Sequence, residues 1–405
     1  MAEAGATEWI LLGSFATALA ILVNPRLRHS PKWGAMVTPL ASIIGSGFLV
    51  SVPLLASRLG IWSVVAICGL CLLAWFIGGA IRFNIAHAEP LCTLGGRDVL
   101  NRVERGSHLV LAAAYFVSVT YYLALLGAFV VKLTGADWPV MGTMIASAFV
   151  IGICAMGVTR GLSGVERAEK LTVAMNLSAI LALLVTLLWR DGHLASAAWH
   201  SVPVTTAYAA GDQLRFLMGL LIVVQGFETT RFTGDMYDAP ARIRAMKRAQ
   251  ILSSLIYVVF FTLMIPLYGQ FQEETDVAGF IGVIGVVSPL LPLLMVMGAV
   301  ASQFSAAVAD SIGSSELVTD LLRGRMGQAA AYWLIGGVAL SLLWLTDVTA
   351  IVALASRAFA LFYALQCGVA AIVAHRRGQM ARSAWYGILG LACAATAIFG
   401  LPAEG

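Results

Sequence analysis

The sequence predicts an all-α polytopic membrane protein with about 12 transmembrane helices. Of the 405 residues, 60% are hydrophobic and only 11% are charged, whereas a soluble domain carries about a quarter charged residues. The mean hydropathy is +0.88. Apolar segments of roughly 17 residues or more, the length that crosses a bilayer, recur along nearly the whole chain between short polar loops. We therefore expect residues 1–405 to form a single transmembrane domain.

Twelve segments are expected to span the membrane. In chain order they are Trp9–Val23, Gly34–Ala56, Ile61–Ile85, His108–Val131, Trp138–Val158, Leu171–Trp189, Leu214–Tyr237, Ala249–Tyr268, Pro289–Leu322, Ala329–Leu345, Val348–Ala374 and Ser383–Leu401. The flank before the first segment holds Glu3 and Glu8 but no Lys or Arg. This flank argues against a cleaved secretory signal.

The basic residues predict the orientation of the chain. With the N-terminus outside, nineteen of the 25 Lys and Arg residues fall on the cytoplasmic side. Only Arg58, Lys132, Arg190 and Arg215 fall on the outer side. Because cytoplasmic loops carry the excess of Lys and Arg, we expect both termini outside, in the cytoplasmic (inner) membrane of a bacterium. The net charge of +4 then reflects topology and indicates no nucleic-acid partner.

Two of the expected spans carry an interruption near their middle. The second contains IIGSGFLV, with Gly45, Ser46 and Gly47 at its centre, and the seventh contains Gln225-Gly226-Phe227-Glu228. Five spans separate the start of one from the start of the other, so the two five-helix units run in opposite senses. This pattern predicts an inverted repeat with two discontinuous helices. Glycine pairs also serve close helix packing, so that simpler explanation stays open.

The predicted repeat divides the transmembrane domain into four parts. An extra N-terminal helix covers residues 9–23, the first five-helix repeat covers 32–190, the second covers 207–377, and a final helix covers 383–401. Each repeat opens with one of the interrupted spans. A binding site near the bilayer midplane is expected where the two interrupted helices meet.

At these residues the sequence resembles the amino acid/polyamine/organocation (APC) superfamily of permeases, which share the leucine-transporter fold. IIGSGFLV, followed by Ala88-Glu89-Pro90 and Gly95-Gly96, is similar to the family's first helix and its glutamate-containing cytoplasmic loop. Gln225–Glu228, Gly234-Asp235 and the basic loop around Pro240 resemble its sixth-helix signature. The resemblance implies a secondary active transporter for amino acids or related amines that works by alternating access.

The resemblance covers about residues 32–377 and has departures that bear on the substrate. Ile222 and Val223 stand where the family often has an aromatic gate. Asp235 and Asp238-Ala239-Pro240 stand where it usually has Glu with Asn-Pro. A carrier of a non-amino-acid solute, such as a nucleobase or an osmolyte, therefore remains an alternative, as does a membrane sensor that binds without transporting.

An interrupted helix leaves backbone groups free to bind a small zwitterion. Amides near Ser46 and Gly47 suit a substrate carboxylate, and carbonyls around Val224 and Gln225 suit its ammonium group. The predicted substrate-binding residues are Ser42, Gly45, Ser46, Gly47, Thr120, Val224, Gln225, Gly226 and Phe227. Thr120 lies among Tyr115, Tyr121 and Tyr122, a group that can close a side-chain pocket or simply pack in the core.

Three charged residues at membrane depth are candidates for proton coupling or gating, because such residues are costly in hydrocarbon. Glu228 follows the second interruption, and the resemblance implies pH sensing or proton coupling there; a structural pair with Arg231 is the alternative. Arg357 is expected to neutralise Glu228 or to face an anionic group of the substrate. Asp310 is expected to be a second protonatable group or the partner of an interfacial base.

Sodium is the other expected coupling ion. Ser302 and Ser305 lie three residues apart on one helix face, and hydroxyl oxygens suit a small hard cation. No other cofactor is predicted. The six histidines show no metal-ligand spacing and no nucleotide-binding loop occurs, so we expect neither an enzyme nor an ATPase partner. The expected partners are a small-molecule substrate, with an amino acid favoured, and the lipid bilayer.

Overall fold

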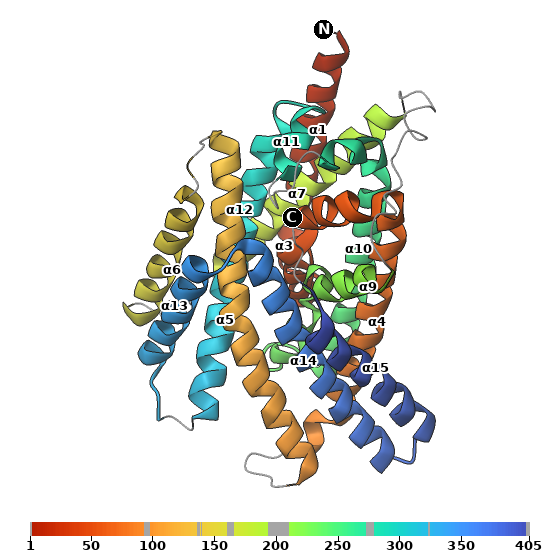
Figure 1. The fold of residues 1–405 in the computed structure, drawn as a ribbon, viewed down its shortest axis with the longest axis vertical. Coiled ribbons are helices and arrows are strands. Elements are labelled where there is room, and N and C mark those ends of the chain that lie inside the picture. The colour runs from red at the N-terminus through yellow and green to blue at the C-terminus, as the bar shows by residue number, and fades with distance from the viewer. Residues whose placement is uncertain are drawn as a thin grey trace.

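The computed structural model describes residues 2–92, 98–135, 138, 140–159, 166–192, 210–272, 279–322 and 325–401. Throughout these residues the chain is helical, with no β-strand, as predicted. The long helices run side by side along the longest axis of the molecule (Figure 1). Gly95-Gly96, part of the predicted cytoplasmic loop motif, lies outside the described residues.

Eleven long helices form the body of the described structure. They are α1 (Ala2–Val23), α3 (Pro31–Leu59), α4 (Ser63–His87), α5 (Val99–Thr134), α6 (Met141–Thr159), α7 (Glu166–Asp191), α10 (Ala239–Met264), α12 (Leu291–Leu321), α13 (Gln328–Leu345), α14 (Val348–Arg376) and α15 (Met380–Phe399). Shorter elements connect them: α2 (Pro25–Arg28), α9 (Ala210–Gly219), α11 (Gly279–Gly285) and the 3₁₀ helices η1 (Gly60–Trp62), η2 (Glu89–Leu91), η3 (Leu221–Val224), η4 (Phe227–Phe232) and η5 (Ile265–Gln272).

Ten stretches of the described chain are long and apolar enough to cross a membrane. One of them, Pro31–His87, contains both α3 and α4, which the short helix η1 separates. The interrupted stretch Ala210–Phe232 is not among the ten because no single helix in it is long enough. Counting α3 and α4 separately and adding this interrupted stretch gives the twelve predicted crossings.

Local sequence explains where several of these helices begin and end. The carboxylates of Asp98, Asp238 and Asp347 each accept a hydrogen bond from a backbone N–H in the first turn of α5, α10 and α14, which satisfies one of the free donors at a helix start. Hydrogen bonds from Asn101 and Arg376 hold the pKa of Asp98 at about 2, so the cap stays ionised. Helix α5 ends at Gly135, whose φ of 64° favours glycine.

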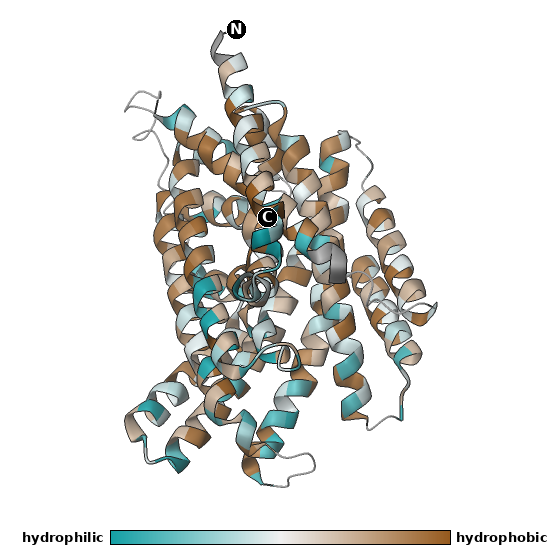
Figure 2. Ribbon diagram, turned by 180° about the vertical axis from the view of Figure 1, so that it is seen from behind, coloured by the Kyte–Doolittle hydropathy of each residue, from teal (hydrophilic) through white to brown (hydrophobic). Residues whose placement is uncertain are grey.

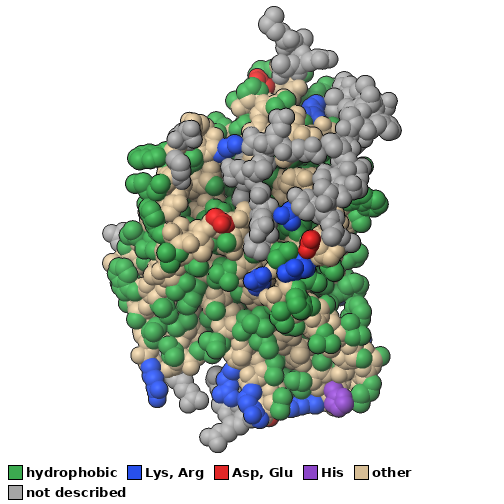
Figure 3. All heavy atoms as spheres, viewed as in Figure 1, with side chains coloured by type: hydrophobic (Ala, Val, Ile, Leu, Met, Phe, Trp, Pro, Cys, Tyr) green, Lys and Arg blue, Asp and Glu red, His purple; other side chains and the backbone are tan. Residues whose placement is uncertain are grey.

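Helix α5 lies at the centre of one half of the bundle. It packs against α6, α12, α13 and α14 (Figure 1). Helix α1 packs on α7, and α15 packs on α14. Hydrophobic residues dominate the long helices, and hydrophilic residues gather toward their lower ends (Figure 2). Lys and Arg side chains also follow the lower edge of the face shown in Figure 3, which is the end where α5 begins.

Candidate functional site

The predicted interruption in the seventh span is present. Helix α9 ends at Gly219, and the chain continues as η3, two non-helical residues and η4. The non-helical residues are Gln225 and Gly226, and Gly226 has a φ of 113°, a conformation that favours glycine. A Cβ atom on Gly226 would lie 2.6 Å from the carbonyl carbon of Ser42 on α3. Gly226 therefore lets the interrupted segment cross α3 with the two backbones in contact.

The predicted interruption in the second span is absent from this structure. Helix α3 is α-helical from Pro31 to Leu59, through Gly45, Ser46 and Gly47. Its amides near Ser46 bond within the helix, so they are not free to bind a substrate carboxylate as expected. The two glycines instead allow close packing: Cβ atoms there would lie 2.7 Å from Ser302 Oγ and 2.5 Å from Val223 Cα. The Ser46 side chain lies outside the described part.

Glu228 is fully enclosed at the start of η4, with 1% of its surface exposed. Its Oε2 accepts hydrogen bonds from the Gly226 N–H at 2.9 Å and from the Tyr363 hydroxyl at 2.7 Å. Phe227 stacks on the Tyr363 ring at a centroid distance of 5.2 Å. Glu228 thus links the interrupted segment to α14, because its two hydrogen-bond donors are the Gly226 amide and the Tyr363 hydroxyl of α14.

Neither arginine that the sequence offered as a partner binds Glu228. The Nε of Arg357 donates to the Gly400 carbonyl at 2.8 Å, because Arg357 lies on the side of α14 that faces the end of α15. Arg231 binds Glu104 at 2.6 Å and Glu89 at 3.6 Å. Arg231 lies near the far end of η4, where Glu104 and Glu89 hold its guanidinium away from Glu228.

The Arg231 contacts belong to a buried polar cluster of Glu89, Glu104, Arg231, Arg242 and Gln366. Arg242 binds Glu89 at 2.7 Å and donates to the Arg231 carbonyl at 2.8 Å. Gln366 accepts a hydrogen bond from Arg231 and donates to Ser107. The cluster joins η2, α5, η4, α10 and α14, so it fixes the end of the interrupted segment against four other elements.

Further predicted site residues surround the crossing. Gln225 is 1% exposed and donates to the Tyr122 hydroxyl at 3.2 Å, while its Oε1 has no partner in the described structure. Val224 is buried. Gln303 on α12 donates to the Gly45 carbonyl at 2.8 Å. Thr120 is fully buried and donates to the Phe116 carbonyl of its own helix, so its hydroxyl is occupied within α5.

Ser302 and Ser305 line a small cavity of about 10 Å³ between α3, α7 and α12. Ser42 and Thr172 add two more hydroxyl groups to the same wall. A space of this size holds about one water molecule or small ion. The oxygen donors fit a hard cation such as sodium, although no carboxylate of the described residues belongs to the lining.

A cavity of about 600 Å³ lies where α3 begins and α12 approaches its end, and we call it the α3–α12 cavity. Its volume falls in the range of small-molecule sites, roughly 300–1,000 Å³. It is lined by Arg28, Gly34, Val37, Thr38, Ser42, Tyr115, Lys170, Thr229, Phe232, Thr233, Met236, Tyr237, Ala309, Asp310, Ile312, Gly313 and Glu316. It thus brings the predicted Ser42 and Asp310 together, and Asp310 accepts a hydrogen bond from Ser118.

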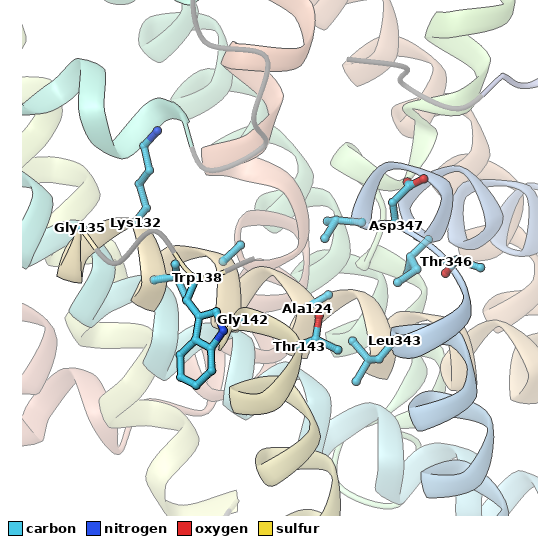
Figure 4. A pocket seen from close by; sticks show the side chains of 13 residues that line it. Ala124, Lys132, Gly135, Trp138, Gly142, Thr143, Leu343, Thr346 and Asp347 are labelled. Atoms are coloured by element: carbon cyan, nitrogen blue, oxygen red, sulfur yellow. The ribbon is translucent and has the colours of Figure 1, made fainter. Parts of the chain in front are cut away.

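A second large cavity, about 650 Å³, lies at the C-terminal end of α5 and is called the α5–α14 crevice. Its walls come from the ends of α5 and α13 and the beginnings of α6 and α14. Lys132 and Trp138 lie on one side of it, and Thr346 and Asp347 on the other (Figure 4). None of the predicted site residues lines it.

A family model described as an APC superfamily transporter matches residues 25–400. The chain belongs to the APC superfamily. A curated relative, an uncharacterized protein of Aquifex aeolicus (strain VF5), is 35% identical over 378 residues, which cover 92% of this chain and 91% of the relative.

Two solved transporters share the fold. A Na⁺-coupled sialic acid symporter in a substrate-bound outward-open state aligns with a TM-score of 0.52 and 17% identity, over 97% of this chain and 96% of that one. Mhp1 in an inward-facing conformation aligns with a TM-score of 0.50 and 15% identity, over 92% and 90% of the two chains. These are leucine-transporter-fold proteins, so the fold implied by the sequence resemblance is confirmed.

Several residues that line the α3–α12 cavity were not among the site residues predicted from the sequence. Thr38, Thr229 and Thr233 line the α3–α12 cavity but carry no motif of their own. A helical-wheel reading supplies one usable signal, since Thr38 lies one turn before Ser42 on the same face of α3. The sequence placed Tyr115 only in a group of residues that can close a pocket or pack in the core. The polar cluster around Arg231 had no local signal, because Glu104 is 127 residues away in the chain.

Proposed function

We propose that this APC-superfamily protein is a secondary active permease for amino acids or related amines that works by alternating access. The observation that carries the proposal is the α3–α12 cavity. It reaches Ser42, where α3 meets Gly226 of the interrupted segment. A solute at this crossing is bounded by both halves of the fold, which is the geometry that a rocking mechanism needs.

Two sites are candidates for coupling transport to an ion gradient. The hydroxyl-lined cavity at Ser302 and Ser305 suits sodium, and the similar fold of a Na⁺-coupled symporter supports that assignment. Glu228 suits a proton, since it is a buried carboxyl whose partners are a hydroxyl and an amide. The third candidate for the energy source is exchange, in which the gradient of one solute drives the transport of another in the opposite direction.

Uptake into proteoliposomes tests the proposal. Purified transporter should accumulate a labelled amino acid or amine from a broad panel, and either a sodium gradient or a pH gradient should increase the initial rate. In the variant Ser302→Ala/Ser305→Ala, a sodium-driven carrier should need at least about tenfold more sodium for half-maximal uptake. In Glu228→Gln, a proton-driven carrier should lose the pH dependence of its rate.

Absence of uptake, exchange and binding across the whole panel would refute the permease proposal. Binding without flux would indicate a sensor instead. The proposed location, a bacterial inner membrane with both termini outside, is tested separately by protease protection of terminal tags in vesicles of known sidedness.

A further inference from the structure

Among the described residues, Asp310 is the one buried charged residue in the wall of the α3–α12 cavity. It is 6% exposed, whereas the other charged lining residues, Arg28, Lys170 and Glu316, are half-buried or exposed. Its Oδ2 accepts a hydrogen bond from the Ser118 hydroxyl. No Lys, Arg or His among the described residues forms an ion pair with Asp310. The enclosed part of the cavity therefore presents a carboxyl group that has a neutral hydrogen-bond donor and no basic partner among the described residues.

The buried arginines of the described bundle, and the half-buried Arg357, have other partners and do not neutralise this carboxyl group. Arg231 and Arg242 bind the glutamates of the polar cluster. Arg82 donates to Gln250 and lies 4.5 Å over the Trp75 ring, and Arg357 binds the Gly400 carbonyl. An ionised carboxylate in a low-dielectric wall is costly without a cation. A cation delivered by the solute removes that cost.

The surroundings of Asp310 suit an ammonium group. Tyr115, which is 5% exposed, lies in the same wall and adds an aromatic ring, which attracts cations. Thr229 and Ser42 add hydroxyl oxygens that accept hydrogen bonds from an ammonium. Lys170 and Arg28 line the same cavity and are more exposed than Asp310. They offer basic partners to a carboxylate on the solute.

We propose that Asp310 binds the protonated amine of the transported solute, which makes the solute an amine or a zwitterion and not a simple acid. This inference rests on the proposed permease function and narrows its substrate class. It assigns the amine to a side chain of α12, whereas the sequence predicted that carbonyls freed around Val224 and Gln225 would bind it.

Matched ligand sets test the assignment on the purified full-length transporter. One set is L-leucine, 3-methylbutylamine, 4-methylpentanoate and N-acetyl-L-leucine; a second is the corresponding set for L-phenylalanine; L-lysine and cadaverine complete the panel. Thermal unfolding in detergent and uptake into proteoliposomes are measured for each compound. Compounds with a free amine should raise the unfolding temperature, and the acid-only and N-acetylated compounds should not.

Three variants separate binding from folding. Asp310→Asn should weaken binding of the amine-bearing compounds at least about tenfold, because a charge-assisted hydrogen bond is lost. Asp310→Glu, which keeps the charge, should retain measurable binding and guards against a general folding defect. Asp320→Asn is the matched control, since it removes an exposed carboxylate of the same helix that does not line the cavity, and its binding should equal that of the unaltered protein.

The outcomes distinguish this inference from the permease proposal. Uptake of an acid-only compound as efficient as that of its amine-bearing counterpart would overturn the amine assignment and leave transport standing. Unchanged affinity for amines in a folded Asp310→Asn variant would do the same. If no compound of the panel binds or is transported, both proposals fall.

Discussion

Gly226 shows how one residue decides the shape of the crossing. Its φ of 113° and its backbone contact with Ser42 leave no room for a side chain. Gly47 meets Val223 as closely from the other helix. The first glycine is needed for both its conformation and its lack of a Cβ atom, whereas Gly47 lies in a regular helix and is needed only for its small size.

Replacement of Gly226 by alanine should therefore be strongly destabilising. We expect Gly226→Ala to lower the free energy of unfolding by at least about 2 kcal/mol, because alanine is strained at positive φ and its Cβ would overlap α3. Denaturant titration in mixed micelles measures the change. Gly69→Ala is the control: Gly69 lies in α4 with open space around it, and its replacement should change stability by less than about 1 kcal/mol. Equal effects of the two changes would contradict the role given to Gly226.

At the scale of elements, the polar cluster holds the end of η4 in place. Arg231 and Glu104 have side chains only 4% and 9% exposed, so each depends on the other for compensation of its charge. A 3₁₀ helix of six residues has few internal hydrogen bonds of its own. The position of η4 therefore comes from its side-chain partners on neighbouring helices.

We expect Glu104→Gln to destabilise the protein by about 2–3 kcal/mol, since it leaves Arg231 buried with only part of its compensation. Arg376→Gln removes an ion pair with Asp98 whose side chains are 45% and 44% exposed, and it should cost less than about 1 kcal/mol. Denaturant titration of both variants beside the unaltered protein gives the comparison. Equally small effects of Glu104→Gln and Arg376→Gln would contradict the structural role given to the cluster.

For the whole molecule, the two large cavities meet α5 at different heights: the α5–α14 crevice is lined by the last turns of the helix, whereas the α3–α12 cavity touches it at Tyr115, near its middle. The basic residues predict that the α3–α12 cavity faces the cytoplasm and the α5–α14 crevice faces outward. The α3–α12 cavity extends to Ser42 and is also lined by Thr229, Phe232 and Thr233 of the interrupted segment or just after it. In the proposed alternating-access cycle, this arrangement would be one of the two states.

Cysteine accessibility tests this orientation. In a background without the six native cysteines, Thr38→Cys, in the α3–α12 cavity, should react with a membrane-impermeant thiol reagent in inside-out vesicles and not in right-side-out vesicles. Thr143→Cys, in the α5–α14 crevice, should show the opposite pattern. Addition of a transported solute should slow labelling of Thr38→Cys. The reverse sidedness for both cysteines would overturn the predicted topology.

Several features followed from sequence because their causes are local. Bilayer thickness sets the length of each apolar segment, so the spans were predictable. The capping hydrogen bonds of Asp98 and Asp238 are also local, but the predicted spans used hydropathy alone and therefore began at His108 and Ala249, after the observed starts of α5 and α10. Gln225-Gly226 predicted a real interruption, since the chain there needs a conformation that glycine provides.

Other features depended on neighbours that are distant in the chain. The same local signal at Gly45-Ser46-Gly47 was misleading, because small residues also allow two helices to pack closely, and α3 meets Val223 and Ser302 there. Arg357 binds Gly400 because the end of α15 is packed beside α14.

The sequence by itself thus determined the fold class, the crossings and the family resemblance, since hydrophobic length and glycine motifs act within a few turns of chain. Only the tertiary structure decided which charges pair and which do not. Pairing depends on distances between helices far apart in sequence, such as the 127 residues between Glu104 and Arg231. It left Asp310 without a basic partner among the described residues, in the wall of a cavity that local patterns did not reveal.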